Sequence, residues 1–208
     1  MSVTGAGLSW SRVAQADGQR GDAEIWTATA PDVLSGVSVT AAQQVTAVGK
    51  MTLQVLSFTG AGAVVGHTGS GASGAPSLGF DAVAADSLVF GAGFDWETAA
   101  ATTAGTGQSI THQISITGTN GNTWMQQLDT PTSTAGQEVT VDDSSPTGEA
   151  WNLAVVEVVP TQVSAATTNH YDNSGDSPGW ISTPGGGWTR NVTGLDGAMD
   201  AIVTYDPT

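Results

Sequence analysis

Two carboxylates, an indole and an imidazole lie within one short stretch of the chain, Phe90–Gln113. It reads FGAGFDWETAAATTAGTGQSITHQ, with Asp95, Trp96 and Glu97 ending an apolar run and His112 inside a later strand-like segment. Two carboxyl groups about 5–10 Å apart can hydrolyse a glycosidic bond. A histidine serves as a general base when it reaches a substrate proton. These residue types raise the hypothesis of a glycoside hydrolase.

The spacing around His112 favours a structural role instead. In SITHQISIT, His112 alternates with polar residues and shares a strand face with Ile110, Ile114 and Ile116. We therefore expect its ring to point inward, among the isoleucines, where it would be neutral and have no access to substrate.

The two acids of the stretch have a structural interpretation as well. Asp95 and Glu97 are only two residues apart, at the point where a strand is expected to end. An aspartate there commonly accepts a hydrogen bond from the backbone two residues on. We expect such a turn, with either acid available as a partner for His112. The sequence thus predicts a protein that is not an enzyme.

Period-2 alternation recurs along the chain, whereas helical periodicity is scarce. The sequence predicts an all-β fold, a two-sheet antiparallel β-sandwich of jelly-roll type with about ten short strands. Asn120-Gly121 marks a hairpin, and the small-residue stretch Gly60–Ser77 is expected to be a loop. The expected strands are Leu8–Ala16, Ala23–Ala30, Val37–Ala42, Met51–Thr59, Leu78–Ala84, Ser87–Phe94, Ser109–Thr117, Asn122–Asp129, Gln137–Asp142 and Trp151–Val159.

The chain changes character after the last of these strands. Residues 1–160 are expected to form the sandwich, and residues 161–208 a loop-rich extension. That extension contains WTRNVTGLDGAMDAIVTY, which echoes the N-terminal WSRVAQADGQRGDAEIW. Two interpretations stay open: the echo begins a second copy of the fold or completes the sandwich, or two hairpins converged on similar turn chemistry.

Composition excludes several classes of function. Lys and Arg number 4 against 19 Asp and Glu, which gives a net charge of −15. Binding to nucleic acid or to anionic membranes needs clustered bases, so neither is expected. Cysteine is absent, which excludes disulfides and thiolate zinc sites. We find no secretory leader and no apolar run approaching the roughly 18 residues of a membrane helix, so membrane insertion is not expected.

The candidate binding residues lie in the extension. Tryptophan, with 7 residues, outnumbers phenylalanine and tyrosine. Trp124 and Trp151 alternate with core-type residues, whereas Trp180 and Trp188 flank proline–glycine loops. Exposed aromatic rings stack against sugars, so Trp180, Trp188 and the nearby Tyr171 are the candidate polysaccharide-binding residues.

One metal ion is compatible with the sequence. The loop YDNSGDSPG gathers oxygen donors in Asp172, Asn173 and Asp176. Calcium prefers several such oxygens, but the same residues also make ordinary polar turns. No cofactor is required, and calcium is the one candidate.

Four segments between Leu8 and Pro160 carry a resemblance: GLSWSRVAQADGQRGDAEIWTATA, LQVLSFTGA, SLVFGAGFDWETAAATTAGTGQSITHQ and WNLAVVEV. Together they resemble a β-sandwich module of actinobacterial secreted multidomain proteins and of phage minor tail and virion-surface proteins. The resemblance implies a structural or adhesive role with no catalytic residues. Related modules usually have one or two strands before the first segment, and only seven residues precede Leu8 here.

These observations lead to one expectation and two alternatives. We expect a non-enzymatic structural or adhesive component of a phage virion, located at the virion surface or extracellular. It would assemble through sheet edges with copies of itself or other virion subunits and present loops to host-surface glycans. The first alternative is a carbohydrate-binding module of a secreted enzyme. The second is the glycoside hydrolase using Asp95, Glu97 and His112.

Overall fold

The computed structural model describes residues 1–43, 51–116, 121–161, 171–172 and 179–180. The chain divides into two compact units, Met1–Thr161 and Gln162–Thr208. The division lies one residue from the expected boundary. No helix occurs among the described residues, and therefore none that is long and apolar enough to cross a membrane.

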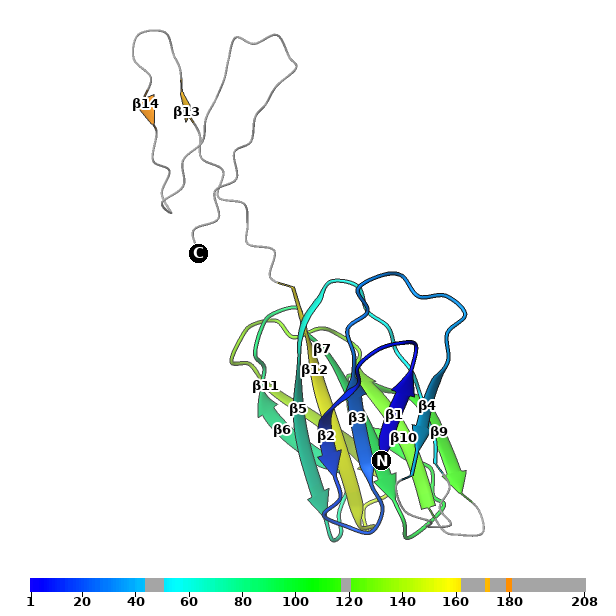
Figure 1. Cartoon of the computed structure of the whole chain (residues 1–208). Coiled ribbons are helices and arrows are strands. Elements are labelled where there is room, and N and C mark those ends of the chain that lie inside the picture. The colour runs from blue at the N-terminus through cyan, green and yellow to red at the C-terminus, as the bar shows by residue number, and fades with distance from the viewer. Residues whose placement is uncertain (44–50, 117–120, 162–170, 173–178, 181–208) are drawn as a thin grey trace. The chain divides into compact units, whose positions relative to one another are not determined.

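The first unit is an all-β, sandwich-like fold of antiparallel strands (Figure 1). Its central sheet has five strands in the order β5-β12-β7-β10-β9. A second sheet has the order β6-β11-β8, and β2-β3 and β1-β4 form separate pairs. The bounds are β1 Ser2–Gly5, β2 Ser11–Ala16, β3 Ala23–Thr27, β4 Val39–Ala42, β5 Ala61–Gly71, β6 Ser77–Asp81, β7 Leu88–Asp95, β8 Thr103–Ala104, β9 Gln108–Ile116, β10 Gly121–Leu128, β11 Glu138–Ser145 and β12 Trp151–Pro160.

The central sheet is covered on both faces. On the inner face, Leu153 and Val155 of β12 and Trp124 of β10 pack with Val139 and Val141 of β11. This cluster joins the two sheets of the sandwich. The burial of Trp124 and Trp151 agrees with the sequence pattern, since 2% and 7% of their surfaces are exposed.

The β2-β3 hairpin covers part of the outer face. Its buried alanines pack against Phe94 of β7 and Ala154 of β12. Strand β12 therefore lies between two apolar layers, which explains why nine of its ten residues are buried. Two polar members of β12 fix turns. Asn152 exchanges hydrogen bonds with Gln19 and donates to Gly21, and Glu157 accepts from the N–H groups of Val83 and Ala84.

Two neighbouring predictions are wrong. Residues 51–59, expected to be a strand, run without regular structure, with Leu53, Val55 and Phe58 exposed. The expected loop Gly60–Ser77 contains β5, whose 11 residues make it the longest strand among those described. The cause is packing: the Val13 carbonyl oxygen lies 2.3 Å from where a Cβ on Gly66 would sit, so the β2 backbone passes too close for a side chain there.

The seven residues before Leu8 also form structure. They contain β1, which pairs with β4 from Ser2↔Ala42 to Gly5↔Val39. One strand therefore precedes the first of the resembling segments, within the chain itself.

Candidate functional site

Asp95 is the last residue of β7 and is 2% exposed. Its Oδ1 accepts a hydrogen bond of 2.6 Å from the Glu97 amide, which is the turn predicted from the spacing. Its Oδ2 is buried and has no hydrogen-bond partner. Burial raises the pKa of Asp95, the Glu97 amide bond opposes that rise, and the negative charges of Glu149 and Glu97 add to it. The carboxyl group therefore belongs to a strand end and is closed to solvent.

Glu97 is tied to a different part of the chain. Its Oε2 accepts a hydrogen bond of 2.8 Å from the backbone N–H of Ala150, just before β12. Trp96, between the two acids, stacks with Phe94 at 5.7 Å, and the Arg20 guanidinium lies 4.4 Å from its ring centroid. The three residues thus join β7 to the β2-β3 turn and to the start of β12.

The prediction that His112 points inward is wrong. Strand β9 pairs with β10 as Met125↔His112 and then Gln126↔Ile110, so one residue of β9 bulges at Thr111. A bulge reverses the alternation of faces beyond it. Ile110 packs against the sandwich core, whereas His112 is exposed.

The two residues that follow His112 show the same reversal, whereas Ile116 at the end of the strand is buried as expected. Ile114 is 41% exposed. Gln113 instead turns inward, where its Oε1 accepts hydrogen bonds from the Thr102 amide and the Asn122 side chain. A polar residue thus occupies the face that the isoleucines were expected to line.

The three candidate catalytic residues do not come together. Asp95 lies opposite Asn122, which lies opposite Ser115 on β9, three residues along from His112. At the usual spacings of a sheet, the Cα atoms of Asp95 and His112 are roughly 14 Å apart. Asp95 also faces the inside of the sandwich, whereas His112 faces solvent. No hydrogen bond joins His112 to either acid.

The candidate binding residues of the extension are described only in part. Backbone pairing of β13 (Tyr171–Asp172) with β14 (Gly179–Trp180) sets Tyr171 directly opposite Trp180. Asp172 lies opposite Gly179. Trp188, Asn173 and Asp176 lie outside the described residues. Within the described part of the chain, no three acids or histidines gather in a way that would hold a metal ion.

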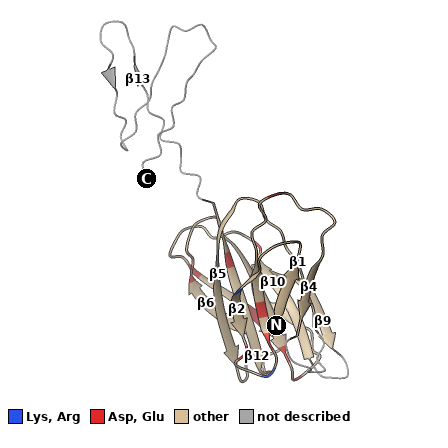
Figure 2. Cartoon of the chain, viewed as in Figure 1, with Lys and Arg blue, Asp and Glu red and all other residues tan. Residues whose placement is uncertain are grey.

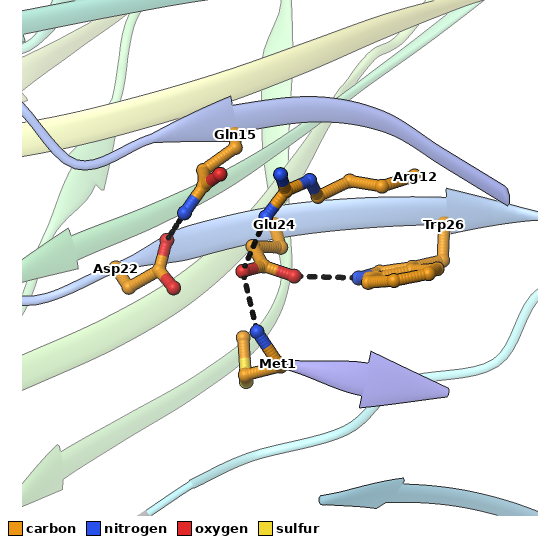
Figure 3. Close-up of polar contacts among 6 residues, drawn as sticks. All are labelled: Met1, Arg12, Gln15, Asp22, Glu24 and Trp26. Atoms are coloured by element: carbon orange, nitrogen blue, oxygen red, sulfur yellow. Dashed lines mark hydrogen bonds and ion pairs between the residues drawn. The ribbon is translucent and has the colours of Figure 1, made fainter. Parts of the chain in front are cut away.

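Sequence reasoning missed a polar cluster on the β2-β3 hairpin (Figure 3). The Glu24 side chain is closed to solvent and accepts hydrogen bonds from the Met1 ammonium at 2.9 Å, Arg12 at 3.1 Å and the Trp26 indole at 2.7 Å. Asp22 accepts one from Gln15. The alternation of Asp22, just before β3, with Glu24 and Trp26 in β3 was the available signal, because such spacing places residues on one face.

The pKa values of the two acids in this cluster, Asp22 and Glu24, are shifted in opposite directions. Burial, together with the hydrogen bond and the charge of Glu24, raises the pKa of Asp22 to about 6. Burial would also raise the pKa of Glu24, but the bonds from the Met1 ammonium, Asp22 and Trp26 outweigh it and lower that pKa. The Met1 ammonium is one of the donors to Glu24, so the cluster ties the N-terminus to the hairpin.

A second buried acid lies inside the sandwich. Asp143 of β11 is 3% exposed, and neither of its carboxyl oxygens has a hydrogen-bond partner. Burial raises its pKa to about 8, and the neighbouring charge of Asp142 adds to this, with a small opposing effect from Gln126 and Trp124. Asp143 is therefore an uncharged acid at neutral pH.

Charged side chains are sparse over the described strands (Figure 2). The two described arginines both lie on aromatic rings, Arg12 at 5.9 Å from Trp26 and Arg20 on Trp96. Lys50 and Arg190 lie outside the described residues. The described part of the chain thus offers backbone edges and apolar loops for contact. Exposed apolar residues include Val33, Leu34 and Val37 between β3 and β4.

No family model matches the chain, and no curated protein or solved structure matches it either.

Proposed function

We propose that this chain is a non-enzymatic structural and adhesive component of a phage virion, a minor tail or surface protein. It assembles through the edges of its sheets, and its loops contact glycans of the host surface. The four segments that resemble modules of virion-surface proteins support this proposal. The geometry of Asp95, Glu97 and His112 supports the absence of catalysis, because two of them hold turns and the third faces solvent alone.

One observation carries the proposal furthest: the central sheet ends in a long strand with no partner on its outer side. Strand β5 pairs with β12, and no second strand pairs with its other edge among the described residues, although β2 packs against its face. An open edge of this length is a template for pairing with another chain. A protein built for assembly needs such an edge, whereas a soluble monomeric enzyme normally protects it.

The proposal is tested by measuring whether the protein binds bacterial envelopes and whether it hydrolyses glycosides. The full chain is incubated with envelope preparations of actinobacteria, the group to which the resemblance points, and with a panel of glycosides. We expect retention on the envelopes and no release of sugar from any glycoside. Failure to bind any envelope, or glycoside turnover that is lost in Asp95→Ala, would overturn the proposal.

A carbohydrate-binding module of a secreted enzyme is the second candidate. The backbone register that sets Tyr171 opposite Trp180 favours it, because it brings two aromatic residues to one position of the β13-β14 pair. Two aromatic residues so placed suit a sugar ring.

Binding to insoluble polysaccharides checks this second candidate. We expect Tyr171→Ala and Trp180→Ala each to lose roughly fivefold or more in affinity, because a stacked aromatic ring contributes about 1–3 kcal/mol at binding sites. Trp96→Ala, which removes an indole from the first unit, serves as the control and should bind as the wild type does. Equal binding by all four proteins would rule out this pair as the sugar site.

A further inference from the structure

The free side of β5 offers backbone groups and little else. The strand reads AGAVVGHTGSG from Ala61 to Gly71, without a formally charged residue and without proline. It pairs with β12 on one side only, and no backbone hydrogen bond to its other side occurs among the described residues. In an antiparallel edge strand, about every second residue directs both its N–H and its C=O outward.

The devices that usually protect an edge are missing from most of β5, from Ala63 to Gly71. Natural edges carry lysine, proline or a bulge, or are short. The ladder of β5 with β12 is unbroken from Ala63 to Gly71, and its one irregularity lies at the start of β5, where Gly62 is the extra residue between Ala61 and Ala63. The opposite edge of the same sheet, β9, is interrupted by its bulge. In the second sheet, edge strand β6 ends in Asp81. Among these edges, β5 is the longest and the least interrupted.

We propose that β5 is an assembly edge, where the β5 strand of a second copy of this chain pairs antiparallel across a two-fold axis. The contact joins two five-stranded sheets into one continuous sheet. This inference rests on the proposed function, because it names the edge through which the protein assembles.

A second copy fits this edge better than a charged partner does. An antiparallel pair of identical strands is self-complementary, as a two-fold contact requires. Each copy carries a net charge of −15, so a contact that set acids against acids would be repelled. Strand β5 brings no formal charge to the contact (Figure 2). Its small residues also leave the edge free of long side chains.

Sedimentation of the full chain tests the pairing directly. We expect the wild type to sediment at twice its 20.9 kDa mass. Thr68→Lys places a charge on the exposed edge of β5 in both copies and should weaken the dimer roughly tenfold or more. Thr140→Lys is the control, because Thr140 is also exposed but lies on β11 of the second sheet, opposite Gly79 of β6 and away from the β5 edge. It should dimerise as the wild type does.

Salt and hydrogen exchange give two independent readouts. Because the contact itself is uncharged, screening the net charges should tighten the dimer when NaCl rises from about 0.05 to about 0.5 M. Alternate β5 amides between Ala63 and Gly71 should be protected in the wild type and exchange quickly in Thr68→Lys.

The outcomes separate this inference from the function it rests on. A monomer that binds envelopes overturns the β5 contact and leaves the adhesive function standing, and a dimer that binds no envelope does the reverse. An oligomer that is unaffected by Thr68→Lys and leaves the β5 amides unprotected would place assembly at another edge and refute the inference.

Discussion

We expect the contribution of the buried acid Asp143 to the stability of this protein to fall as pH rises. Its pKa in the folded chain is about 8, against an ordinary value of 3.8. Between these values the folded chain holds a proton that the unfolded chain releases. The folded state therefore binds more protons, and the free energy of unfolding decreases with pH, by about 1.4 kcal/mol per pH unit for this one group.

Replacing Asp143 by asparagine removes this dependence while keeping the shape of the protonated acid. The free energy of unfolding of Asp143→Asn should exceed that of the wild type by an amount that grows by roughly 2.5–3 kcal/mol from pH 5 to pH 7. Other titrating groups, including Asp22 and Asp95, cancel in the difference between the two proteins. This difference stops growing near pH 8, where Asp143 ionises in the folded chain as well.

Urea unfolding at several pH values between 5 and 7.5, followed by tryptophan fluorescence, measures this difference. Asp32→Asn, in an exposed loop, controls for the loss of one negative charge and should show no growing difference from the wild type. The reasoning fails if the difference between Asp143→Asn and the wild type stays constant with pH, or shrinks between pH 5 and pH 7. Equal urea m-values would show that the unfolded reference has not changed.

Two further substitutions test the packing around the central sheet. Asn152→Ala leaves the Gln19 amide without its buried acceptor, and should lower the free energy of unfolding by roughly 2–3 kcal/mol in urea titrations; an unchanged midpoint would mean that Asn152 does not fix the β2-β3 turn. Gly93→Ala should lower the free energy of unfolding by roughly 3 kcal/mol in the same urea titrations, because its Cβ would lie 2.1 Å from the buried Trp124 ring. Gly79→Ala, whose Cβ would have 3.9 Å of clearance, should be nearly neutral.

The sequence pattern correctly predicted the strands of the central sheet that are buried on both faces. The run WNLAVVEVV corresponds to β12, and the stretch from Leu88 to Phe94 lies within β7. Such strands carry the signal because burial selects large apolar side chains at regular positions. The same rule failed at Met51–Thr59, where apolar residues lie along the surface without forming a strand.

The sequence also did not predict where β9 contains a bulge. Nothing in SITHQISIT marks Thr111 as the extra residue, because any residue type can occupy that position. One unpaired residue sufficed to send His112 outward and Gln113 inward. Buried partners decided the outcome: Gln113 satisfies the Thr102 amide and the Asn122 side chain, which apolar residues cannot do.

The small residues of strand β5 have two structural consequences: they allow close packing against neighbouring layers, and they leave the edge of the strand open. Its glycines resemble a loop in the sequence, yet Gly66 makes room for the backbone of β2, and a Cβ on Gly71 would lie 2.7 Å from the Trp151 indole. Small residues are therefore required where the two neighbouring layers approach. The same residues leave the outer side of the strand without charge or bulk. The packing that holds β5 in the sheet thus also leaves its backbone accessible to a second strand, and this links the fold to assembly.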